Sequence, residues 1–260
     1  PKDNVALGYK ALRAITSGTF NSAIGSQSLL SVTTGGYNNA VGSQALDALT
    51  TGVENQAMGV GALGSLTTQG SNIAIGGYAG TGITGSDAID NVLIGGYAGT
   101  GGSGNLKRSI AIGKTALNST GTNSVLGAVA IGFDALTALT SGSANTAIGY
   151  ESAKALTTGG ANVSIGYQAM SIGTVVNNSV AIGRSAGKNI ATDGNAQRNT
   201  YVGAYAGETV TNGIGQTFVG YYAGKAYDSG NFNSDVTYIG VSAGQNHTDG
   251  GNNTAIGAYA

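Results

Sequence analysis

The chain has 260 residues, of which 47 are glycine, one is proline and none is cysteine, and its charged residues amount to only 9% with a net charge of −1. The missing cysteines exclude a disulfide scaffold and a cysteine-based metal or redox site, and the single proline excludes collagen. The near-zero net charge gives no basic surface for nucleic acid, and no apolar run is long enough to insert into a membrane as a helix.

One short segment, Asn-x-Ala-aliphatic-Gly-x-x-Ala, recurs from end to end of the chain in fifteen copies. We call the glycine of each copy its signature glycine; the residue before it is always Leu, Ile, Val or Met. Successive signature glycines are 17 to 20 residues apart, most often 17. In chain order they are Gly8, Gly25, Gly42, Gly59, Gly76, Gly95, Gly113, Gly132, Gly149, Gly166, Gly183, Gly203, Gly220, Gly240 and Gly257.

The length of this unit predicts the fold class. About 17 residues are too few for a helical repeat, and glycine at this density breaks helices. The run x-Ala-Ile-Gly has strand length, and Thr-Thr-Gly or Thr-Ser-Gly in many copies predicts a second short strand or turn. We therefore expect an all-β chain, a parallel β-solenoid of about 15 coils of about 17 residues. Residues 1–260 are interpreted as a single β-solenoid repeat domain. Because neither end carries an atypical capping repeat, we expect the domain to be a fragment of a longer chain or to be covered at its ends by other proteins.

Alternation along a strand predicts which side chains face inward. We expect the aliphatic residue before each signature glycine to point into the coil and its neighbour, usually Ala, to point outward against another chain. Tyr201, Phe218 and Tyr238 occupy this outward position in three successive coils, and are predicted to stack at the interface of a homotrimer. The Asn that precedes the signature glycine by four residues in ten copies is expected at a corner, bonding to the turn and to the Asn of the next coil.

The segment from Asn178 to Gly183, Asn-Ser-Val-Ala-Ile-Gly, resembles the head repeats of trimeric autotransporter adhesins, and residues 108–113 are similar to it. The commoner form, as at 145–150, is similar to repeats of phage and other viral tail-fibre proteins, whose steady period of 17 this chain shares. The resemblance implies a left-handed β-roll, three chains side by side, and an extracellular appendage on a virion or, alternatively, on a bacterial outer surface.

Candidate catalytic and cofactor-binding residues carry little signal. Two G-x-G-x-x-G matches, at 80–85 and 99–104, are expected by chance in so glycine-rich a chain and are followed by no predicted helix. His247, the single histidine, is interpreted as a solvated loop residue, and Asp87, Asp90, Asp228 and Asp235 as scattered loop acids. We therefore expect no enzyme, no cofactor and no metal site.

The favoured function is a structural, receptor-binding tail fibre or spike shaft that mediates host attachment, with an adhesin head as the alternative. A less favoured alternative is an ice-binding protein, because Thr pairs stacked along a flat face of a β-solenoid are also typical of some proteins of that class. The longer intervals, 81–91, 118–128, 188–198 and 225–235, predict loops on a rigid scaffold; these either only absorb insertions or contact a host receptor, such as a glycan. The last loop is richest in contact groups, with Tyr227, Asp228, Asn231, Phe232, Asn233 and Asp235.

Overall fold

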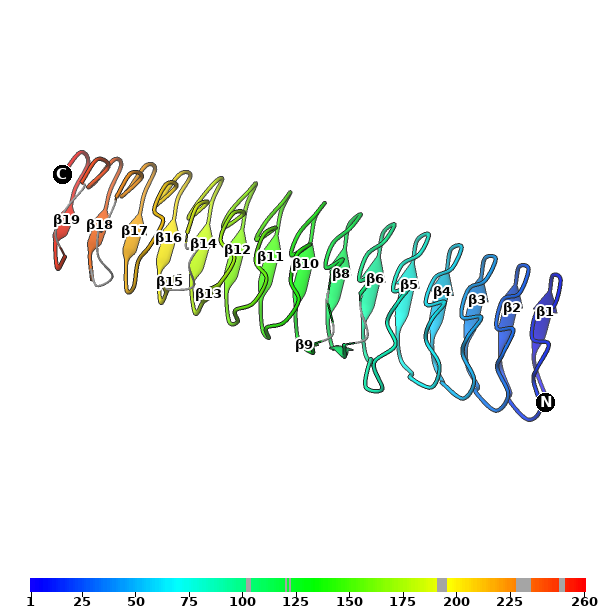
Figure 1. Ribbon diagram of the computed structural model, residues 1–260. Coiled ribbons are helices and arrows are strands. Elements are labelled where there is room, and N and C mark those ends of the chain that lie inside the picture. Colours follow the sequence, from blue (N-terminus) through cyan, green and yellow to red (C-terminus); the bar gives the residue numbers. More distant parts are fainter. Residues whose placement is uncertain (102–103, 120, 122, 191–195, 228–234, 248–250) are drawn as a thin grey trace. The chain divides into compact units, whose positions relative to one another are not determined.

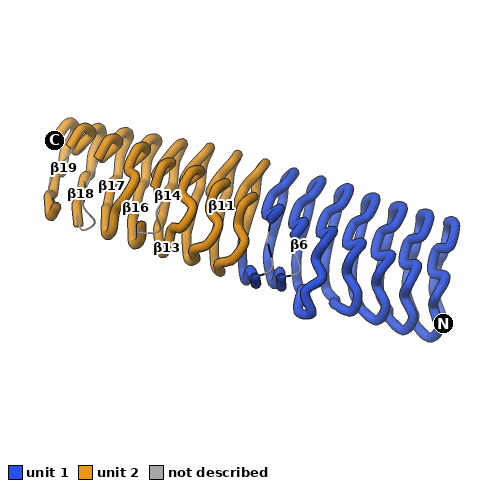
Figure 2. Tube along the Cα trace, in the orientation of Figure 1, with its two compact units in different colours: residues 1–128 blue, residues 129–260 orange. Residues whose placement is uncertain are grey.

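The computed structural model covers residues 1–260 and describes all of them except 102–103, 120, 122, 191–195, 228–234 and 248–250. It divides into two compact units, Pro1–Ala128 and Val129–Ala260 (Figure 2). The described residues form strands and turns and no helix, as the sequence predicts. The prediction of a single repeat domain stays a prediction.

Each signature glycine directly follows one short strand, which we call a repeat strand. In unit 1 these are β1 (Val5–Leu7), β2 (Ser22–Ile24), β3 (Asn39–Val41), β4 (Gln56–Met58), β5 (Ile73–Ile75), β6 (Val92–Ile94) and β8 (Ile110–Ile112). In unit 2 they are β10 (Val129–Ile131), β11 (Thr146–Ile148), β12 (Val163–Ile165), β14 (Val180–Ile182), β16 (Thr200–Val202), β17 (Thr217–Val219), β18 (Thr237–Ile239) and β19 (Thr254–Ile256).

Within each unit every repeat strand pairs in parallel with that of the next coil, so equivalent residues stack (Figure 1). Ala6 lies beside Ala23, for example, and Tyr201 beside Phe218. Each unit is a parallel β-solenoid, and together they hold about 14 turns, close to the predicted number. Two small parallel sheets join neighbouring coils elsewhere, β7 (Leu106–Lys107) with β9 (Val125–Leu126) and β13 (Val176–Asn177) with β15 (Ala196–Gln197).

The predicted direction of the strand side chains is wrong. From β2 to β18 the middle residue of every repeat strand is buried, whereas the aliphatic residue after it is half-buried or exposed, as at Ile24 (38% exposed) and Met58 (53%). The reason is the narrow coil interior. In many coils it is filled from the opposite wall by a leucine four residues after the signature glycine, such as Leu29 or Leu46, which leaves room only for alanine on the strand.

Where a strand brings a large residue inside, the opposite wall carries glycine instead of leucine. An added Cβ would lie 2.6 Å from the Tyr201 ring at Gly187 and 2.6 Å from the Phe218 ring at Gly224. This wall position has a left-handed backbone in both cases, with φ of 52° at Leu46 and 54° at Gly224, so glycine and leucine can exchange there without changing the turn.

The predicted aromatic stack exists, but inside the coil. The ring centroids of Tyr201 and Phe218 lie 5.2 Å apart, as do those of Phe218 and Tyr238, with interplanar angles of 18° and 6°. At most 2% of each side chain is exposed in a single chain. These three rings are therefore core residues, and their assignment to a trimer interface is wrong.

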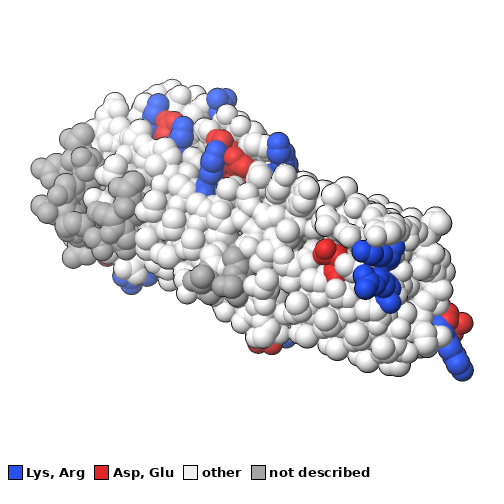
Figure 3. Space-filling model, turned by 45° about the vertical axis from the view of Figure 1, so that its right-hand side comes forward, with Lys and Arg blue, Asp and Glu red and all other residues white. Residues whose placement is uncertain are grey.

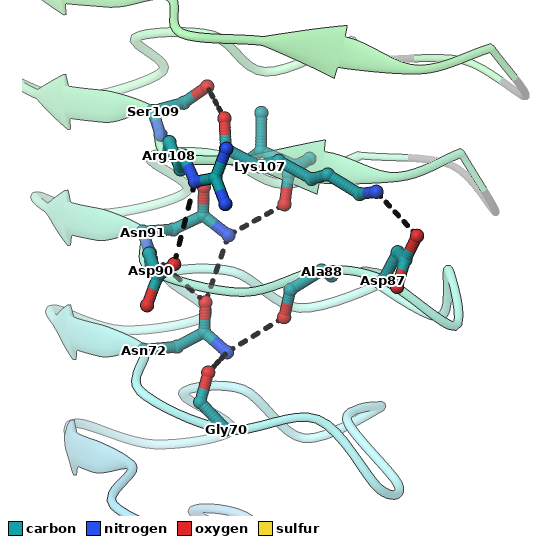
Figure 4. Close-up of polar contacts among 10 residues, drawn as sticks. Gly70, Asn72, Asp87, Ala88, Asp90, Asn91, Lys107, Arg108 and Ser109 are labelled. Carbon is teal, nitrogen blue, oxygen red and sulfur yellow. Dashed lines mark hydrogen bonds and ion pairs between the residues drawn. The ribbon is translucent and has the colours of Figure 1, made fainter.

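The predicted asparagine ladder is confirmed. Asn91 donates from its backbone N–H and from its side-chain Nδ2 to Oδ1 of Asn72 in the preceding coil, at 3.2 and 2.9 Å (Figure 4). Its Nδ2 also donates to the carbonyl of Leu106 at 2.7 Å. The same pattern joins Asn21 to Asn38. Because these amides are buried, each such contact satisfies groups that would otherwise be costly to bury, and it holds the corner of one coil to the next.

Candidate association and receptor-binding surfaces

In each of the two units, the outer face of the repeat strands carries a column of aliphatic side chains. We call the residue before each signature glycine, taken over all coils, the aliphatic column. In unit 1 it is Leu7, Ile24, Val41, Met58, Ile75, Ile94 and Ile112, and in unit 2 it is Ile131, Ile148, Ile165, Ile182, Val202, Val219, Ile239 and Ile256. All are half-buried or exposed. Contiguous apolar surface of this kind is typical of an interaction site.

The first residue of each repeat strand lies on the same face and is more varied. It is Val, Ile or Thr in twelve coils, but Ser22, Asn39 and Gln56 occupy it in three successive ones. Nδ2 of Asn39 donates to Oε1 of Gln56 at 2.7 Å. The neighbouring Val41, Met58 and Ile75 border a hollow of about 230 Å³ beside these amides. The face is thus apolar with one polar interruption in unit 1.

Stacked aromatic rings follow the corner just after the signature glycines. In unit 2 the ring centroids of Phe133 and Tyr150 lie 5.4 Å apart, and those of Tyr150 and Tyr167 lie 5.2 Å apart. The guanidinium of Arg184 continues the stack, 5.7 Å from the Tyr167 centroid and 5.4 Å from that of Tyr205. Because each ring within the stack covers the faces of its neighbours, it presents mainly its edge to solvent.

Charges beside this stack neutralise one another. Nζ of Lys154 lies 2.8 Å from Glu151 and 3.1 Å from Asp134. The hydrogen bonds from Lys154 and Gln168 hold the pKa of Glu151 below its ordinary value. Figure 3 shows the charged groups of one face gathered in small clusters, with most of that face uncharged. Such a surface gives no single-sign field for a polyanion or polycation.

The loop 225–235 does not present the predicted contact groups as a set. Tyr227 is fully buried, with its ring edge-on to Phe218 and Tyr238 at 5.8 and 5.9 Å, so its assignment as an exposed receptor-binding residue is wrong. The backbone turns the Tyr227 side chain into the interior of the coil, beside Phe218 and Tyr238, and the length of the loop does not predict this turn. Asp235 is exposed and lies beside Gly215. The other predicted residues, Asp228, Asn231, Phe232 and Asn233, lie outside the described part of the chain.

In the loop 81–91, the acidic residues pair with the next coil. Lys107 contacts Asp87, and Nε of Arg108 lies 3.7 Å from Asp90, beside the asparagine ladder (Figure 4). Both pairs are largely exposed and therefore contribute little stability. They account for these two aspartates as contacts between coils.

His247 is half-buried and not a solvated loop residue. Its Nδ1 lies 2.8 Å from the hydroxyl of Tyr238, and its ring stacks on that of Tyr227 at 5.8 Å. Burial, with a smaller contribution from Tyr227, raises the pKa of Tyr238 to about 12, so its hydroxyl is a neutral group at physiological pH. The ring of His247 closes the edge of the aromatic core.

The glycines of the two G-x-G-x-x-G matches have roles in packing. Gly80 and Gly99 face the Leu93 side chain in the core, and Gly82 lies against the carbonyl of Gly101. Within the described residues, no three His, Asp or Glu side chains come together as metal ligands. The same part of the chain has no helix with the length and apolarity to cross a membrane.

The candidate surfaces are thus an aliphatic column on the strand face, an aromatic stack at one corner, and ion-paired loops. The aliphatic column is a surface that the sequence did not predict, because strand alternation alone favoured these side chains pointing into the coil. Comparison of the chain with protein-family models, with curated proteins and with solved structures finds no match.

Proposed function

We propose that this chain is part of a non-enzymatic, receptor-binding fibre, in which copies of the chain associate side by side through the aliphatic column. The observation that carries this proposal is the regularity of the column, which has an aliphatic residue in each of the fifteen copies of the repeat. Full burial of one such side chain stabilises by ~1.5–3 kcal/mol, and a periodic column multiplies the gain along the interface. A second copy of the chain has the same period and can match it coil for coil.

The threefold stoichiometry, the left-handed winding and the extracellular location follow from the resemblance of 145–150 and 178–183 to fibre and adhesin repeats. The favoured assignment is to a phage or other viral tail fibre or spike shaft, because the commoner repeat and its period are similar to those of that group. The adhesin head of a bacterial outer surface is the second candidate, supported by the segment Asn178–Gly183.

Ice binding has weaker support. One threonine of each pair uses its hydroxyl between coils, since Oγ1 of Thr33 donates to the carbonyl of Thr50 and Oγ1 of Thr50 to that of Thr67, at 3.1 and 3.0 Å. Thr140 makes the same bond to Thr157 at 3.0 Å. Hydroxyls held by neighbouring carbonyls are not free donors for a surrounding water lattice.

Charges placed in the aliphatic column are expected to abolish association without unfolding the chain. In the variant Ile148→Glu with Ile165→Glu, both carboxylates project outward from neighbouring strands, where burying them against another copy is prohibitive. The expected result is a species with the mass of one chain and an unchanged far-ultraviolet circular dichroism spectrum. Sedimentation velocity measures the mass.

The matched control is Ala144→Glu with Ala161→Glu, which adds the same charges to the same two coils at the corner before the strand. Glu54 occupies the equivalent position with φ of 60°, against 57° at both alanines, so the backbone accepts glutamate there. This control is expected to keep the mass of the parent protein. An Ile148→Glu, Ile165→Glu variant that also keeps it would place the association face elsewhere.

Binding of the fluorescently labelled protein to cells tests the proposed function and distinguishes a viral tail fibre from a bacterial adhesin. Attachment to particular bacterial strains supports a phage fibre, whereas attachment to epithelial cells or matrix proteins supports an adhesin. Binding to neither across a broad panel of both would contradict a receptor-binding role for this chain.

A further inference from the structure

One coil lacks side chains at two neighbouring surface positions. Gly61 and Gly64 are the second and fifth residues after the signature glycine Gly59. Among the fifteen copies, no other has glycine at either position. The coil before carries Gln44 and Asp47 there, and the coil after carries Tyr78 and Thr81. The surface is therefore interrupted for the thickness of one coil.

The interruption is a notch of about 190 Å³, lined by Gln44, Asp47, Gly61, Gly64, Tyr78 and Thr81. Its floor is backbone, because neither glycine has a side chain. Oγ1 of Thr81 donates to the carbonyl of Gly61, which holds one wall to the floor. The space is of the order of one small ring-shaped molecule and is open to solvent.

The wall on the side of the following coil is an aromatic ring. One face of Tyr78 is stacked on Tyr97, with centroids 5.3 Å apart and an interplanar angle of 17°. Its other face is turned toward Gly61, where an added Cβ would lie only 2.9 Å from Cδ1 of the ring. Among the residues that the structure describes, no aromatic ring covers that face, since the equivalent residue is Gly61, and Tyr78 is 43% exposed. The notch is the place of a missing ring in the stack.

The opposite wall supplies polar groups. Oδ1 of Asp47 lies 3.3 Å from the Cβ position of Gly64, so the carboxylate borders the notch. Burial raises the pKa of Asp47, an effect opposed by hydrogen bonds from the backbone N–H groups of Asp47 and Ala48. Unlike Glu151 and Glu208, Asp47 makes no ion pair with any residue that the structure describes. The amide of Gln44, beside it, can both donate and accept.

We propose that this notch binds a neutral pyranose sugar, with the ring against Tyr78 and the hydroxyls on Asp47 and Gln44. A pyranose presents an apolar face of C–H groups that suits an aromatic ring, and its hydroxyls donate to a carboxylate and exchange hydrogen bonds with an amide. The unpaired charge of Asp47 disfavours sialic and uronic acids by repulsion. The proposal builds on the receptor-binding role, for which it names the class of receptor, a neutral glycan.

Saturation-transfer difference NMR on the whole protein tests this with named probes: the methyl glycosides of glucose, galactose, mannose and N-acetylglucosamine, and glucuronic acid, each at millimolar concentration. We expect transfer to at least one neutral glycoside and a weaker signal for glucuronic acid. No transfer to any glycoside, or a preference for glucuronic acid, would overturn the proposal.

Gly61→Tyr supplies the missing ring and is expected to weaken binding at least tenfold. The backbone conformation suits this residue, because φ is 63° at Gly61 and 58° and 59° at Tyr78 and Tyr97, and the Tyr78 ring has to shift to make room for the added Cβ. Thr115→Tyr is the matched control: it adds a ring at the same position of the repeat three coils from Gly61, where φ is 59° and no residue of the notch is contacted, and it is expected to bind like the parent protein. Asp47→Asn removes the charge without changing the shape and is expected to weaken binding while leaving the melting temperature undiminished.

Retained binding by a folded Gly61→Tyr variant would place the sugar elsewhere. The same variants are expected to keep the mass of the parent protein. A chain that associates and attaches to cells but binds no sugar would refute sugar binding at the notch and leave the proposed fibre function intact. A chain that binds sugar but neither associates nor attaches to cells would refute the fibre function and leave sugar binding at the notch intact.

Discussion

Replacing Gly76 with alanine is expected to lower the free energy of unfolding by more than about 3 kcal/mol. Gly76 has φ of 135°, a conformation that residues with a Cβ rarely adopt. An added Cβ would lie 2.6 Å from the carbonyl carbon and 2.7 Å from the carbonyl oxygen of Gly95 in the next coil. Both contacts are with backbone, which can move only if two coils separate and lose their ladder hydrogen bonds.

The adjacent residue supplies the control. A Cβ at Gly77 would meet nothing within 4 Å, and no positive φ is required there, so Gly77→Ala is expected to change the free energy of unfolding by no more than ~0.5 kcal/mol. Urea unfolding followed by circular dichroism, at one protein concentration for all variants, compares the two. Equal effects of the two alanines would mean that the signature glycines do not set the spacing of the coils.

Phe218→Ala is expected to lower the free energy of unfolding by ~3–5 kcal/mol. The ring is fully buried between Tyr201 and Tyr238. The opposite wall offers nothing to refill the cavity, because Gly207 and Gly224 face the ring there. Phe133→Ala is the matched control: that ring is 40% exposed, and its loss is expected to cost less than ~1.5 kcal/mol.

A second substitution tests the size matching directly. Phe218→Ala with Gly224→Leu recreates the alanine and leucine pair found in other coils, such as Ala23 with Leu29. The φ of 54° at Gly224 is close to the 47° at Leu29, so the turn is compatible with leucine. The double variant is expected to be more stable than Phe218→Ala alone. A double variant less stable than the single one would contradict the matching of wall and strand.

The sequence predicted the solenoid and its asparagine ladder because both depend on spacing. A period of 17 with Asn at one fixed place leaves few ways to pair Asn21 with Asn38 other than stacking. It did not predict which strand face lies inside, because adjacent residues such as Ala23 and Ile24 are both apolar. That choice depends on the width of the coil, which is set by Leu29 on the far wall.

The candidate surfaces were harder to predict for a related reason. Loop length suggested that Tyr227 is exposed, whereas the chain turns it into the aromatic core beside Phe218. The notch exists because two residues at its floor, Gly61 and Gly64, have no side chain. In a chain with 47 glycines, only alignment of the coils shows that these two stand where the other copies carry side chains.

The proposed association of copies of this chain through the aliphatic column is tested most directly by the mass of the purified protein. Sedimentation velocity across a range of micromolar concentrations is expected to show a single species with three times the mass of one chain. A single species with the mass of one chain over the whole range would contradict association through the aliphatic column, because the protein would then be stable with this column exposed to water.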